Sequence, residues 1–573
     1  MMYLHERYLV KPYSNRKKSL PLLFVFLLLL FFLLNPSGCL GEKQKLVLSV
    51  QPISGDGAEK VDYWYEAKEK RYFFLPSYFD AGSLLLTVHG TESVVIDGTK
   101  YRSGDPISLL PDHDYQVSGD GFSSFTLIIM QSANLPSFFV ETESGSMESV
   151  HKKKGIREAG NLLAVSADGT VEYKDVLDYI KGRGNSTFTY PKKPYQVKLK
   201  TGASLGGLPR NKTFILLANY IDRSEIRNTI AFDLARYSGA YAYTPSCQSV
   251  DLYLNHEYAG CYLLTEKCEI GKKRLNIVDL EKATEQLNTE PLNSFPFAGN
   301  KYYGPLLTRC YEIPKEPDDI TGGYLILMNN KDYYLKEPSG FSTKRLQPFT
   351  IDQPKYCSVA QIEYIRDVMQ EIENGLFSRD GRDPSTGRHY SELLDMKSFV
   401  NRYLQSETMM DYDGQRPYFY KDSDAVDGKV YCGPVWDQDN ILGVSMRRGK
   451  ANMISVENDH MRHYYWFPRA MKQPDFRAEV IRTYYEVYRP AYRILLGELT
   501  DESGVLRSID DYTEEVRRSE EMDHIRWKVS LWRKKTGANT HIGNSPDTCA
   551  DFLKSFIRTH MKTIDKAYPE NSQ

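Results

Sequence analysis

A glycine- and hydroxyl-rich turn carries the first side chains that could do chemistry, in the sequence Gly182-Arg183-Gly184-Asn185-Ser186-Thr187. Glycines allow backbone amides to approach an anion closely, and the side chains of Arg183, Asn185 and Ser186 can hydrogen-bond its oxygens. The turn therefore predicts a phosphate-binding loop. Because it matches neither the Walker motif nor GxGxxG, a hairpin turn without a ligand is the alternative.

A strand is expected shortly after this turn, in the sequence Tyr195-Gln196-Val197-Lys198-Leu199-Lys200. Alternation along a strand places Lys198 on the face opposite Val197 and Leu199. A lysine beside the turn could neutralise the charge of a bound phosphate. The alternative is a solvated lysine on the protein surface.

Two groups of aspartates follow further along the chain. Asp411 and Asp413 come at the end of an expected helix, and Asp437 and Asp439 follow a strand and a polar turn. Their spacing places Asp437 and Asp439 on one side of an extended segment. Carboxylate oxygens suit Mg²⁺ or Mn²⁺, which keeps waters and takes its remaining ligands from substrate phosphates. An upstream aspartate could then orient or deprotonate a hydroxyl, although caps and turns would use the same residues.

The order of these parts is typical of protein-kinase-like phosphoryl transferases: phosphate loop, strand lysine, helix, aspartate at a helix end, hairpin and metal-binding aspartate. Segments that carry this order are IKGRGNSTF, YPKKPYQVKL, LLANYIDRSEIRNTIAFDLAR, VDLYLNHEYAGCYLLTEK, GGYLILMN, YFYKD and GPVWDQDNILG. In order and spacing they resemble the CotH family of spore-coat-type protein kinases. The similarity extends from about residue 135 to beyond residue 560.

The resemblance implies an atypical kinase fold with a small β-rich lobe, a larger helical lobe, and ATP with a divalent metal between them. It implies that the phosphates of ATP are bound by Arg183, Asn185, Ser186 and Lys198. Either Asp411 or Asp413 takes the role of catalytic aspartate, and Asp411 is preferred because six residues separate it from YFYKD. Asp437 is expected to bind the metal with Asp439 as the second ligand, and Arg227, Asn228 and Glu266 to contact or support the cofactor site.

The chain departs from the family pattern in two places. Met409 stands where many relatives have an asparagine, two residues before the catalytic aspartate. The stretch Gln415-Arg416-Pro417 also offers no clear asparagine ligand. These departures bear on a second metal site and on catalytic activity.

The amino terminus has the pattern of a targeting segment. Basic residues, among them Lys17 and Lys18, precede the uncharged run from Leu20 to Leu34, and Cys39 follows small residues. This order is typical of a signal peptide, and the cysteine resembles the acylated residue of bacterial lipoproteins. The sequence thus predicts an extracytoplasmic protein attached to the membrane through Cys39. The alternatives are an uncleaved signal anchor, or a signal peptide that is cleaved nearby without a role for Cys39.

Composition and strand patterning set the domain organisation. The chain has 573 residues and a formal charge of −2, so no global field steers it onto nucleic acid, and nucleic acid is not an expected partner. Closely spaced short strands predict a small β-sandwich over 45–134, which follows the signal segment 1–39. Mixed strands and helices then predict an α+β kinase-like domain over 135–573. Well-signalled helices include one behind Asp222 and Glu225, and others over Gln361–Leu376 and Phe399–Met410.

The expected function is transfer of the γ-phosphoryl group of ATP to Ser or Thr hydroxyls of a cell-envelope or secreted protein. Because ATP is scarce outside the cytoplasmic membrane, the alternative is an inactive kinase-like scaffold or adhesion lipoprotein. A glycan-active hydrolase is a third interpretation, since paired carboxylates and aromatic side chains also serve that chemistry. A hydrolase has no need of the phosphate loop.

Overall fold

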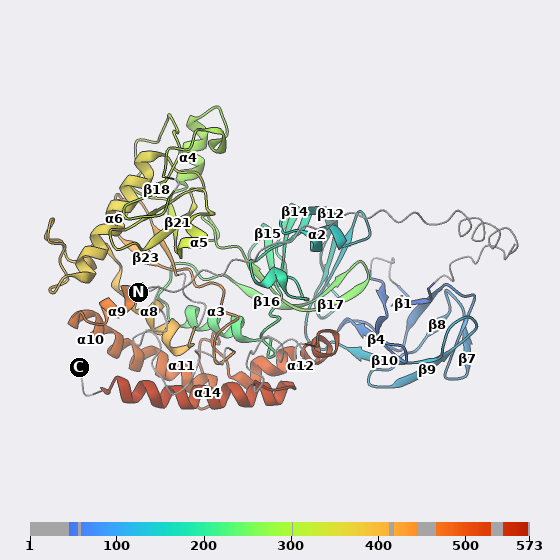
Figure 1. Ribbon diagram of the computed structural model, residues 1–573. Helices are drawn as coiled ribbons and strands as arrows, with labels where there is room; N and C mark the ends of the chain where they lie inside the picture. The colour runs from blue at the N-terminus through green and yellow to red at the C-terminus, as the bar shows by residue number, and fades with distance from the viewer. Residues whose placement is uncertain are drawn as a thin grey trace, which may run out of the picture.

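The computed structural model of the chain has a mixed α+β fold (Figure 1). It describes residues 45–54, 59–300, 302–411, 417–444, 466–528 and 542–570. The targeting segment with Cys39, and Asp413, lie outside the described residues. Among the residues that are described, no helix has the length and apolar character needed to cross a bilayer.

The first unit consists of two small sheets that share one hydrophobic core. One sheet has the strand order β2-β1-β5-β8 and the other has the order β3-β4-β10-β9-β6-β7. The strands are β1 (Val47–Pro52), β2 (Val61–Asp62), β3 (Trp64–Ala67), β4 (Lys70–Leu75), β5 (Leu84–His89), β6 (Val94–Ile96), β7 (Thr99–Tyr101), β8 (Pro106–Ile107), β9 (Asp114–Ser118) and β10 (Phe125–Gln131). Alternating apolar residues such as Leu84, Leu86 and Val88 point into this core, as the sequence pattern predicts.

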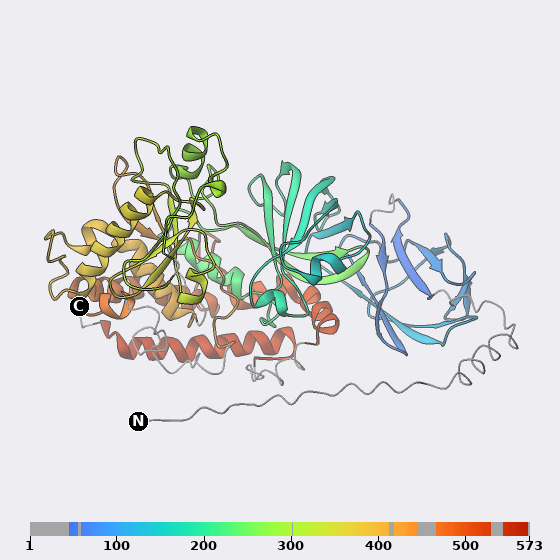
Figure 2. The same cartoon turned by 45° about the horizontal axis from the view of Figure 1, so that its top comes forward.

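A closed barrel follows, with the strand order β11-β12-β13-β14-β15-β17-β16, and β11 pairs with β16 in parallel to close it. In the view of Figure 2 the barrel lies between the first unit and the rest of the molecule. Its strands are β11 (Ser137–Thr142), β12 (Arg157–Val165), β13 (Val171–Gly182), β14 (Tyr195–Ala203), β15 (Asn211–Leu217), β16 (Cys247–Leu254) and β17 (Glu257–Glu266), with helices α2 (Glu148–Lys152), η1 (Thr187–Thr189) and α3 (Arg227–Tyr237). Its interior is filled by a separate apolar cluster that includes Val197, Leu199 and Phe214.

The remaining sheet has six strands in the order β18-β20-β21-β19-β22-β23, and helices cover it. Its strands are β18 (Thr308–Arg309), β19 (Tyr324–Met328), β20 (Gly340–Ser342), β21 (Pro348–Gln353), β22 (Tyr418–Lys421) and β23 (Val430–Cys432). The helices that belong to this region are α4 (Leu280–Leu287), η2 (Leu292–Ser294), α5 (Lys331–Tyr334), α6 (Val359–Phe377), α7 (Tyr390–Leu393) and α8 (Met396–Thr408). The largest apolar cluster of the protein joins this sheet to α3 and to the C-terminal helices.

The C-terminal helices form a layer beneath the barrel and the third sheet in Figure 1. They are α9 (Trp466–Ala470), α10 (Pro474–Thr483), the π-helical turn η3 (Tyr484–Tyr488), α11 (Arg489–Leu495), α12 (Ile509–Arg526) and α14 (Pro546–Ala567). Helix α12 also contacts the first unit, because Met522 joins its core and Arg518 pairs with Asp112 at 2.8 Å. The C-terminal layer therefore ties the successive units of the chain together.

Helix α3 begins in a different way from the sequence prediction. Asp222 and Glu225 have the spacing of a capping box, but Asp222 accepts hydrogen bonds from the backbone N–H of Ser224 and Arg227, at 3.0 and 2.9 Å. Glu225 is buried and pairs with Lys192 at 3.3 Å. Glu225 therefore forms a long-range ion pair instead of the helix cap that local spacing predicts. Gly239 ends the helix as predicted, with a φ of 59°.

Candidate functional site

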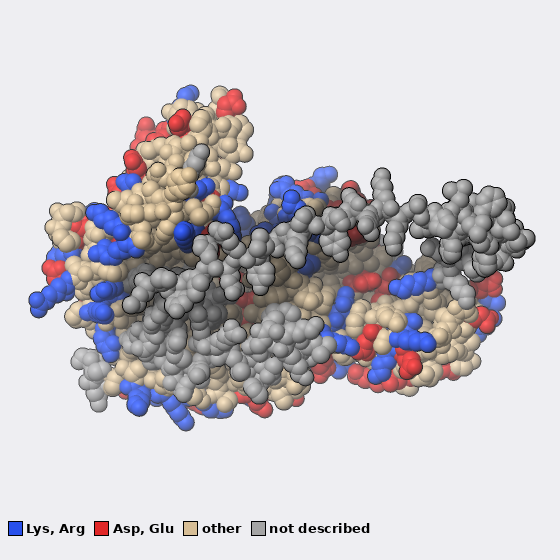
Figure 3. All heavy atoms as spheres, in the orientation of Figure 1, with Lys and Arg blue, Asp and Glu red and all other residues tan. Residues whose placement is uncertain are grey.

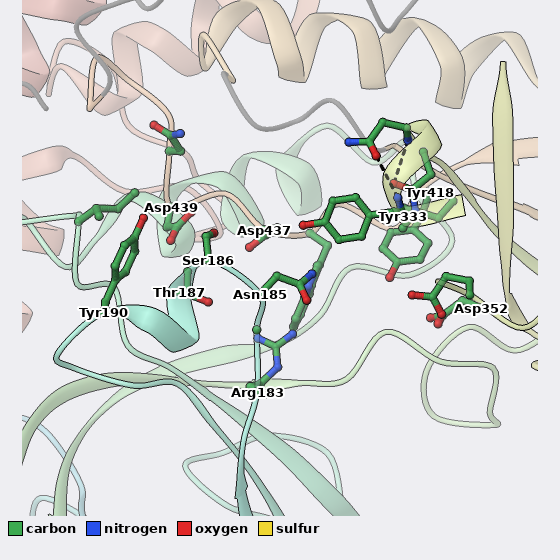
Figure 4. Close-up of a pocket in the computed structure, with 18 residues that line it drawn as sticks. Arg183, Asn185, Ser186, Thr187, Tyr190, Tyr333, Asp352, Tyr418, Asp437 and Asp439 are labelled. Atoms are coloured by element: carbon green, nitrogen blue, oxygen red, sulfur yellow. Dashed lines mark hydrogen bonds between the residues drawn. The ribbon is translucent and has the colours of Figure 1, made fainter. Parts of the chain in front are cut away.

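A cavity of about 410 Å³ lies where the barrel, the third sheet and the segment after β23 meet. Figure 4 shows the glycine-rich turn and Asp439 on one side of it, with Tyr333, Tyr418 and Asp352 on the other. Polar groups dominate its lining, which consists of Arg183, Gly184, Asn185, Ser186, Thr187, Tyr190, Ile221, Leu327, Asn329, Asn330, Tyr333, Glu337, Asp352, Tyr418, Trp436, Asp437, Asp439 and Asn440. The cavity is therefore suited to a polar ligand of small-molecule size.

The glycine-rich turn follows β13 and lines one wall of this cavity. Gly184 has a φ of 82°, and a Cβ atom there would lie 2.1 Å from the Oγ1 of Thr187. Only glycine therefore fits at this position. The side chains of Asn185 and Ser186 are exposed, and the Oδ1 of Asn185 accepts a hydrogen bond from Lys154 at 2.9 Å. The turn presents three polar side chains from one short segment.

Arg183 provides the positive charge at the centre of the cavity. Its guanidinium lies 5.6 Å from the centre of the Trp436 ring, which is within the range of a cation–π contact. Burial lowers the pKa of Arg183, and the nearby carboxylates of Asp437 and Asp439 act in the opposite direction. The side chain stays charged, because the usual pKa of arginine is far above neutrality. A cation held between carboxylates and an aromatic face is positioned to bind anionic oxygens.

The two aspartates after β23 face the cavity together. Asp437 and Asp439 both line it, whereas Gln438 between them is fully buried. The Nε2 of Gln438 donates to the carboxylate of Asp411 at 2.8 Å and to the carbonyl of Trp436 at 3.1 Å. Asp437 and Asp439 thus share one side of the segment as predicted, but Asp437 has a φ of 61°, so the segment is not the extended one that the prediction assumed.

Helix α3 holds this acidic segment from behind. The Oδ1 of Asn228 accepts from the backbone N–H of Gln438 at 2.9 Å. Arg227 donates to the carbonyls of Ile441 and Leu442, at 3.0 and 3.4 Å, and is only 1% exposed. The structure therefore places Arg227 outside the cavity, as a residue that positions the segment carrying Asp437 and Asp439.

Residues with an unusual backbone conformation occur in the segments that build or support the acidic wall. Asn219, Glu225, Met410, Asp437 and Leu442 are not glycines, yet each has a φ between 47° and 61°. Such a conformation costs roughly 1–2 kcal/mol per residue and persists only where the surrounding structure enforces it. All five lie in the segments that build or support the acidic wall. Six other non-glycine residues with a positive φ, among them Asn255 and Leu346, lie outside these segments.

The structure does not bring the preferred catalytic aspartate to the cavity. Asp411 is 1% exposed, and its carboxylate pairs with Arg402 at 3.5 Å in addition to its contact with Gln438. It supports the acidic segment from within the protein and does not line the cavity. The preference for Asp411 as the residue that meets a substrate hydroxyl is therefore corrected, because that residue is enclosed by its own partners.

The lysine selected from the strand pattern also lies away from the cavity. Lys198 is on the face of β14 opposite Val197 and Leu199, as predicted, but that face is the outside of the barrel. Its side chain is 41% exposed and contacts Asp178 at 3.5 Å. Because the barrel closes around Val197 and Leu199, the strand turns Lys198 outward and cannot present it to a phosphate held by the glycine-rich turn.

A different lysine, not singled out in the sequence, lies close behind the site. Lys192 is completely buried, and its Nζ contacts Asp523 at 2.6 Å and Glu225 at 3.3 Å. It also lines a hollow of about 20 Å³ together with Asp437 and Asp439. That volume is enough for one water molecule. Lys192 thus connects the site to helix α12. The one sequence feature that could have indicated this lysine was its position in the segment YPKKPYQVKL.

Glu266 is a supporting residue as well. It is 1% exposed, accepts a hydrogen bond from the backbone N–H of Ser246 at 2.9 Å, and lies 3.7 Å from Arg274. It does not line the cavity, so the structure assigns it to the junction between β16 and β17.

The wall opposite the glycine-rich turn was missed by reasoning from the sequence. It includes Asn329 and Asn330 after β19, Tyr333 in α5, and Asp352 at the end of β21. Burial raises the pKa of Asp352, while Lys267 and Lys355 act to lower it. The segment GGYLILMN ends at Asn329 and offered one signal for this wall. Nothing local distinguished Asp352 from an ordinary strand residue.

The donor set of the cavity fits a hard divalent cation that takes further ligands from a substrate. Asp437 and Asp439 supply carboxylate oxygens to one space, and Asn440 lines it too. Mg²⁺ and Mn²⁺ bind through one or two carboxylates and complete their shells with waters and phosphates. Within the described ranges, no group of three or more His, Cys, Asp or Glu residues could hold a metal by itself.

Comparison with known proteins places the chain in a family. The family model described as CotH kinase protein matches residues 180–564, which include the glycine-rich turn, α3 and the acidic segment. The chain belongs to the CotH family. No curated protein matches the chain.

One solved structure is described as a putative glycoside hydrolase from Bacteroides thetaiotaomicron. It is 10% identical and covers 56% of this chain and 87% of its own, with a TM-score of 0.12. A TM-score this low carries no argument about fold or activity. The CotH assignment therefore rests on the family model and on the order of the segments it covers.

The described cysteines of this CotH protein form no disulfide. Cys247, Cys261, Cys268, Cys310, Cys357, Cys432 and Cys549 are free thiols. Cys261 and Cys268, close enough along the chain to bridge, are both buried and unpaired with each other.

Proposed function

We propose that this CotH protein transfers the γ-phosphoryl group of ATP to a Ser or Thr hydroxyl of a protein. The observation that carries the proposal is the juxtaposition of the glycine-rich turn and Arg183 with Asp437 and Asp439 across one cavity. Phosphoryl transfer depends mainly on positioning and on neutralising charge around the phosphates. Arg183, Asn185 and Ser186 would bind phosphate oxygens in this arrangement.

The proposal includes a kinase-like division into two lobes. The barrel would serve as the small lobe, and the third sheet with its helices as the large lobe. The cavity is lined by residues of both parts, which supports this division. Tyr333, Tyr418 and Trp436 supply aromatic surface beside Arg183, and such surface suits a nucleotide base.

A divalent cation is part of the proposed reaction. Asp437 and Asp439 would hold Mg²⁺ or Mn²⁺, which when bound would neutralise phosphate charge. Arg183 would carry the complementary charge from the barrel side. The proposed residue for orienting the substrate hydroxyl is Asp413, the other aspartate that the sequence offers for this role.

The proposed location is outside the cytoplasmic membrane, with a lipid anchor at Cys39. The basic residues, the apolar run from Leu20 to Leu34, and the small residues before Cys39 support it. ATP is scarce in that location. The protein would therefore need tight nucleotide binding or a local supply of ATP, and its substrate would be a cell-envelope or secreted protein.

Calorimetric titration of ATP with Mg²⁺ or Mn²⁺ tests the proposal. Wild-type protein is compared with Asp437→Asn and with Asp318→Asn, which removes an exposed carboxylate that does not line the cavity. Metal-dependent binding should be lost in Asp437→Asn and retained in the control. Transfer of labelled phosphate to envelope proteins should follow the same pattern.

Absence of metal-dependent binding by the folded wild-type protein would overturn the proposal. It would favour a surface scaffold that has the fold of the family without its chemistry. Equal binding by Asp437→Asn would instead show that the acidic pair has been given the wrong role.

A further inference from the structure

A second hollow, of about 620 Å³, lies on the outside of the barrel, and half of the residues that line it are basic. One side is formed by the hairpin of β14 and β15, with Lys200, Arg210 and Lys212, and the other by a turn with Lys272 and Lys273. We call these five residues and the hollow between them the basic groove. All five are exposed. Lys and Arg side chains are exposed on the face of the molecule that Figure 3 shows, as are Asp and Glu side chains.

The basic groove has a positive charge that the described residues leave uncompensated. None of its five cations forms an ion pair within the described part of the chain. Glu269 is the acidic residue that lines the groove, and it already pairs with Lys267 at 2.9 Å and with Arg274. The groove therefore presents several cations whose charge is balanced only by solvent ions, which a polyanion would displace.

The walls of the groove are built by specific contacts. Arg274 has a side chain that is 2% exposed and donates to the carbonyl of Thr213 on β15 at 2.7 Å. Gly271 donates to the carbonyl of Leu275 at 2.9 Å, which closes the turn that carries Lys272 and Lys273. A buried arginine thus holds this turn against the barrel.

The floor of the groove is an interrupted strand pair. β14 and β15 pair regularly up to Lys198 opposite Thr213, and pairing resumes only at Ala203 opposite Asn211. Four residues lie between the paired positions on β14 and one on β15, a bulge that separates the strands locally. The stretch from Lys200 to Gly202 is therefore available for contacts outside the ladder.

Cations continue from the groove toward the cavity. Lys267 pairs with Glu269 in the groove and also influences Asp352 in the cavity wall. Burial lowers the pKa of Lys181, and the neighbouring cations Arg157, Lys267 and Lys355 lower it further. Lys181 thus lies near several other cations, and Lys267 among them is paired with Glu269.

The distribution of charge favours a chain of spaced carboxylates over a single phosphate. A site for one phosphate brings donors to a point, usually with backbone amides or a bidentate arginine. Here four of the five cations are lysines, and they lie on both sides of an exposed hollow. Lysines act as separate point charges and suit a series of acidic side chains.

We propose that the basic groove docks an acidic stretch of the protein substrate, at a distance from the hydroxyl that is phosphorylated in the cavity. The choice of a protein as partner rests on the proposed function. The groove would raise the local concentration of substrate and set which hydroxyls reach Asp437 and Asp439. The five cations are positioning residues in this proposal and take no part in phosphoryl transfer.

Fluorescence anisotropy with a fluorescein-labelled oligoglutamate tests the proposal on the full chain. The double variant Lys272→Glu/Lys273→Glu is compared with Arg558→Glu/Lys562→Glu, which makes the same change of charge on the exposed face of α14. Binding should weaken about tenfold or more in the groove variant, because two attractions become repulsions. The control variant should bind oligoglutamate as tightly as the wild type does. Added salt should weaken the binding of both the control variant and the wild type.

Three outcomes would overturn the proposal: no binding of oligoglutamate, equal weakening in the control variant, or equal affinity for an oligothymidylate of the same charge. The last outcome would indicate a general polyanion surface. Titration of ATP with Mg²⁺ into the same variants separates the two proposals, because it reports on the cavity alone. Absence of oligoglutamate binding by the wild-type protein, with its nucleotide binding intact, would overturn docking and leave the proposed function standing.

Discussion

Replacement of Lys192 by methionine should destabilise the protein strongly, although the side chains have similar length. Nζ of Lys192 contacts Asp523 at 2.6 Å, Glu225 at 3.3 Å and the carbonyl of Cys261 at 2.5 Å. Both carboxylates are only 3% exposed. Burial acts to lower the pKa of Lys192, but the two carboxylates outweigh it and hold that pKa above its usual value. The lysine is therefore charged and fully paired in the folded protein.

The expected loss follows from what the substitution leaves behind. Methionine fills the space but leaves the carboxylates of Asp523 and Glu225 buried without their cation. Removal of one partner from a buried ion pair costs about 3–5 kcal/mol. The matched control is Lys198→Met, because Lys198 is 41% exposed and its contact with Asp178 is solvated. Loss of an exposed pair costs about 0–1 kcal/mol.

Differential scanning calorimetry distinguishes these two outcomes. At roughly 2 °C per kcal/mol, the value for a large domain, Lys192→Met should lower the main unfolding temperature by roughly 6–10 °C. Lys198→Met should change it by about 2 °C or less. Equal unfolding temperatures for Lys192→Met and wild type would refute the reasoning, since a buried pair of carboxylates cannot lose its cation without cost.

Three further results are expected. Burial raises the pKa of Asp251 to about 6, so this group stabilises the fold fully below about pH 4 and that contribution is lost as the pH rises through 6. When thermal unfolding is measured between pH 4 and pH 7, the free energy of unfolding should fall less in Asp251→Asn than in the wild type, by up to about 2–3 kcal/mol. Equal declines in the two proteins would contradict this expectation. Lys198→Ala should leave calorimetric binding of ATP with Mg²⁺ unchanged, since Lys198 lies outside the cavity; a marked loss would restore the role that the strand pattern assigned to it. Asn228→Ala removes the acceptor for the backbone N–H of Gln438 and should weaken metal-dependent nucleotide binding about tenfold, while Asn211→Ala, on the outside of the barrel, should not.

Local pattern was sufficient for most secondary structure. Apolar alternation identified the strands of the first unit, and the periodicity of 361–376 and 399–410 identified α6 and α8. It also placed Asp437 and Asp439 on one side of their segment, as the buried Gln438 between them confirms. These features depend on neighbours within a few residues, which is why a single sequence contains them.

The partners of charged side chains were not available from local pattern. Spacing assigned Glu225 to a cap, and the structure pairs it with Lys192 and places Asp523 on the same lysine. Local pattern likewise assigned Asp411 to a substrate, whereas in the structure its carboxylate contacts Arg402 and Gln438. Burial and pairing depend on residues that are far apart in the chain. The local sequence around a carboxylate at a helix end therefore does not show whether it faces a substrate or the core.

The sequence by itself determined the family, the α+β character of the chain, and the turn and acidic segment from which the site is built. Only the tertiary structure decided that Lys198 faces outward, that Asp411 is enclosed, and that Tyr333 and Asp352 complete the cavity. The physical reason is that backbone geometry fixes the direction of a side chain locally. What that side chain meets depends on barrel closure and on packing between segments that are far apart in sequence.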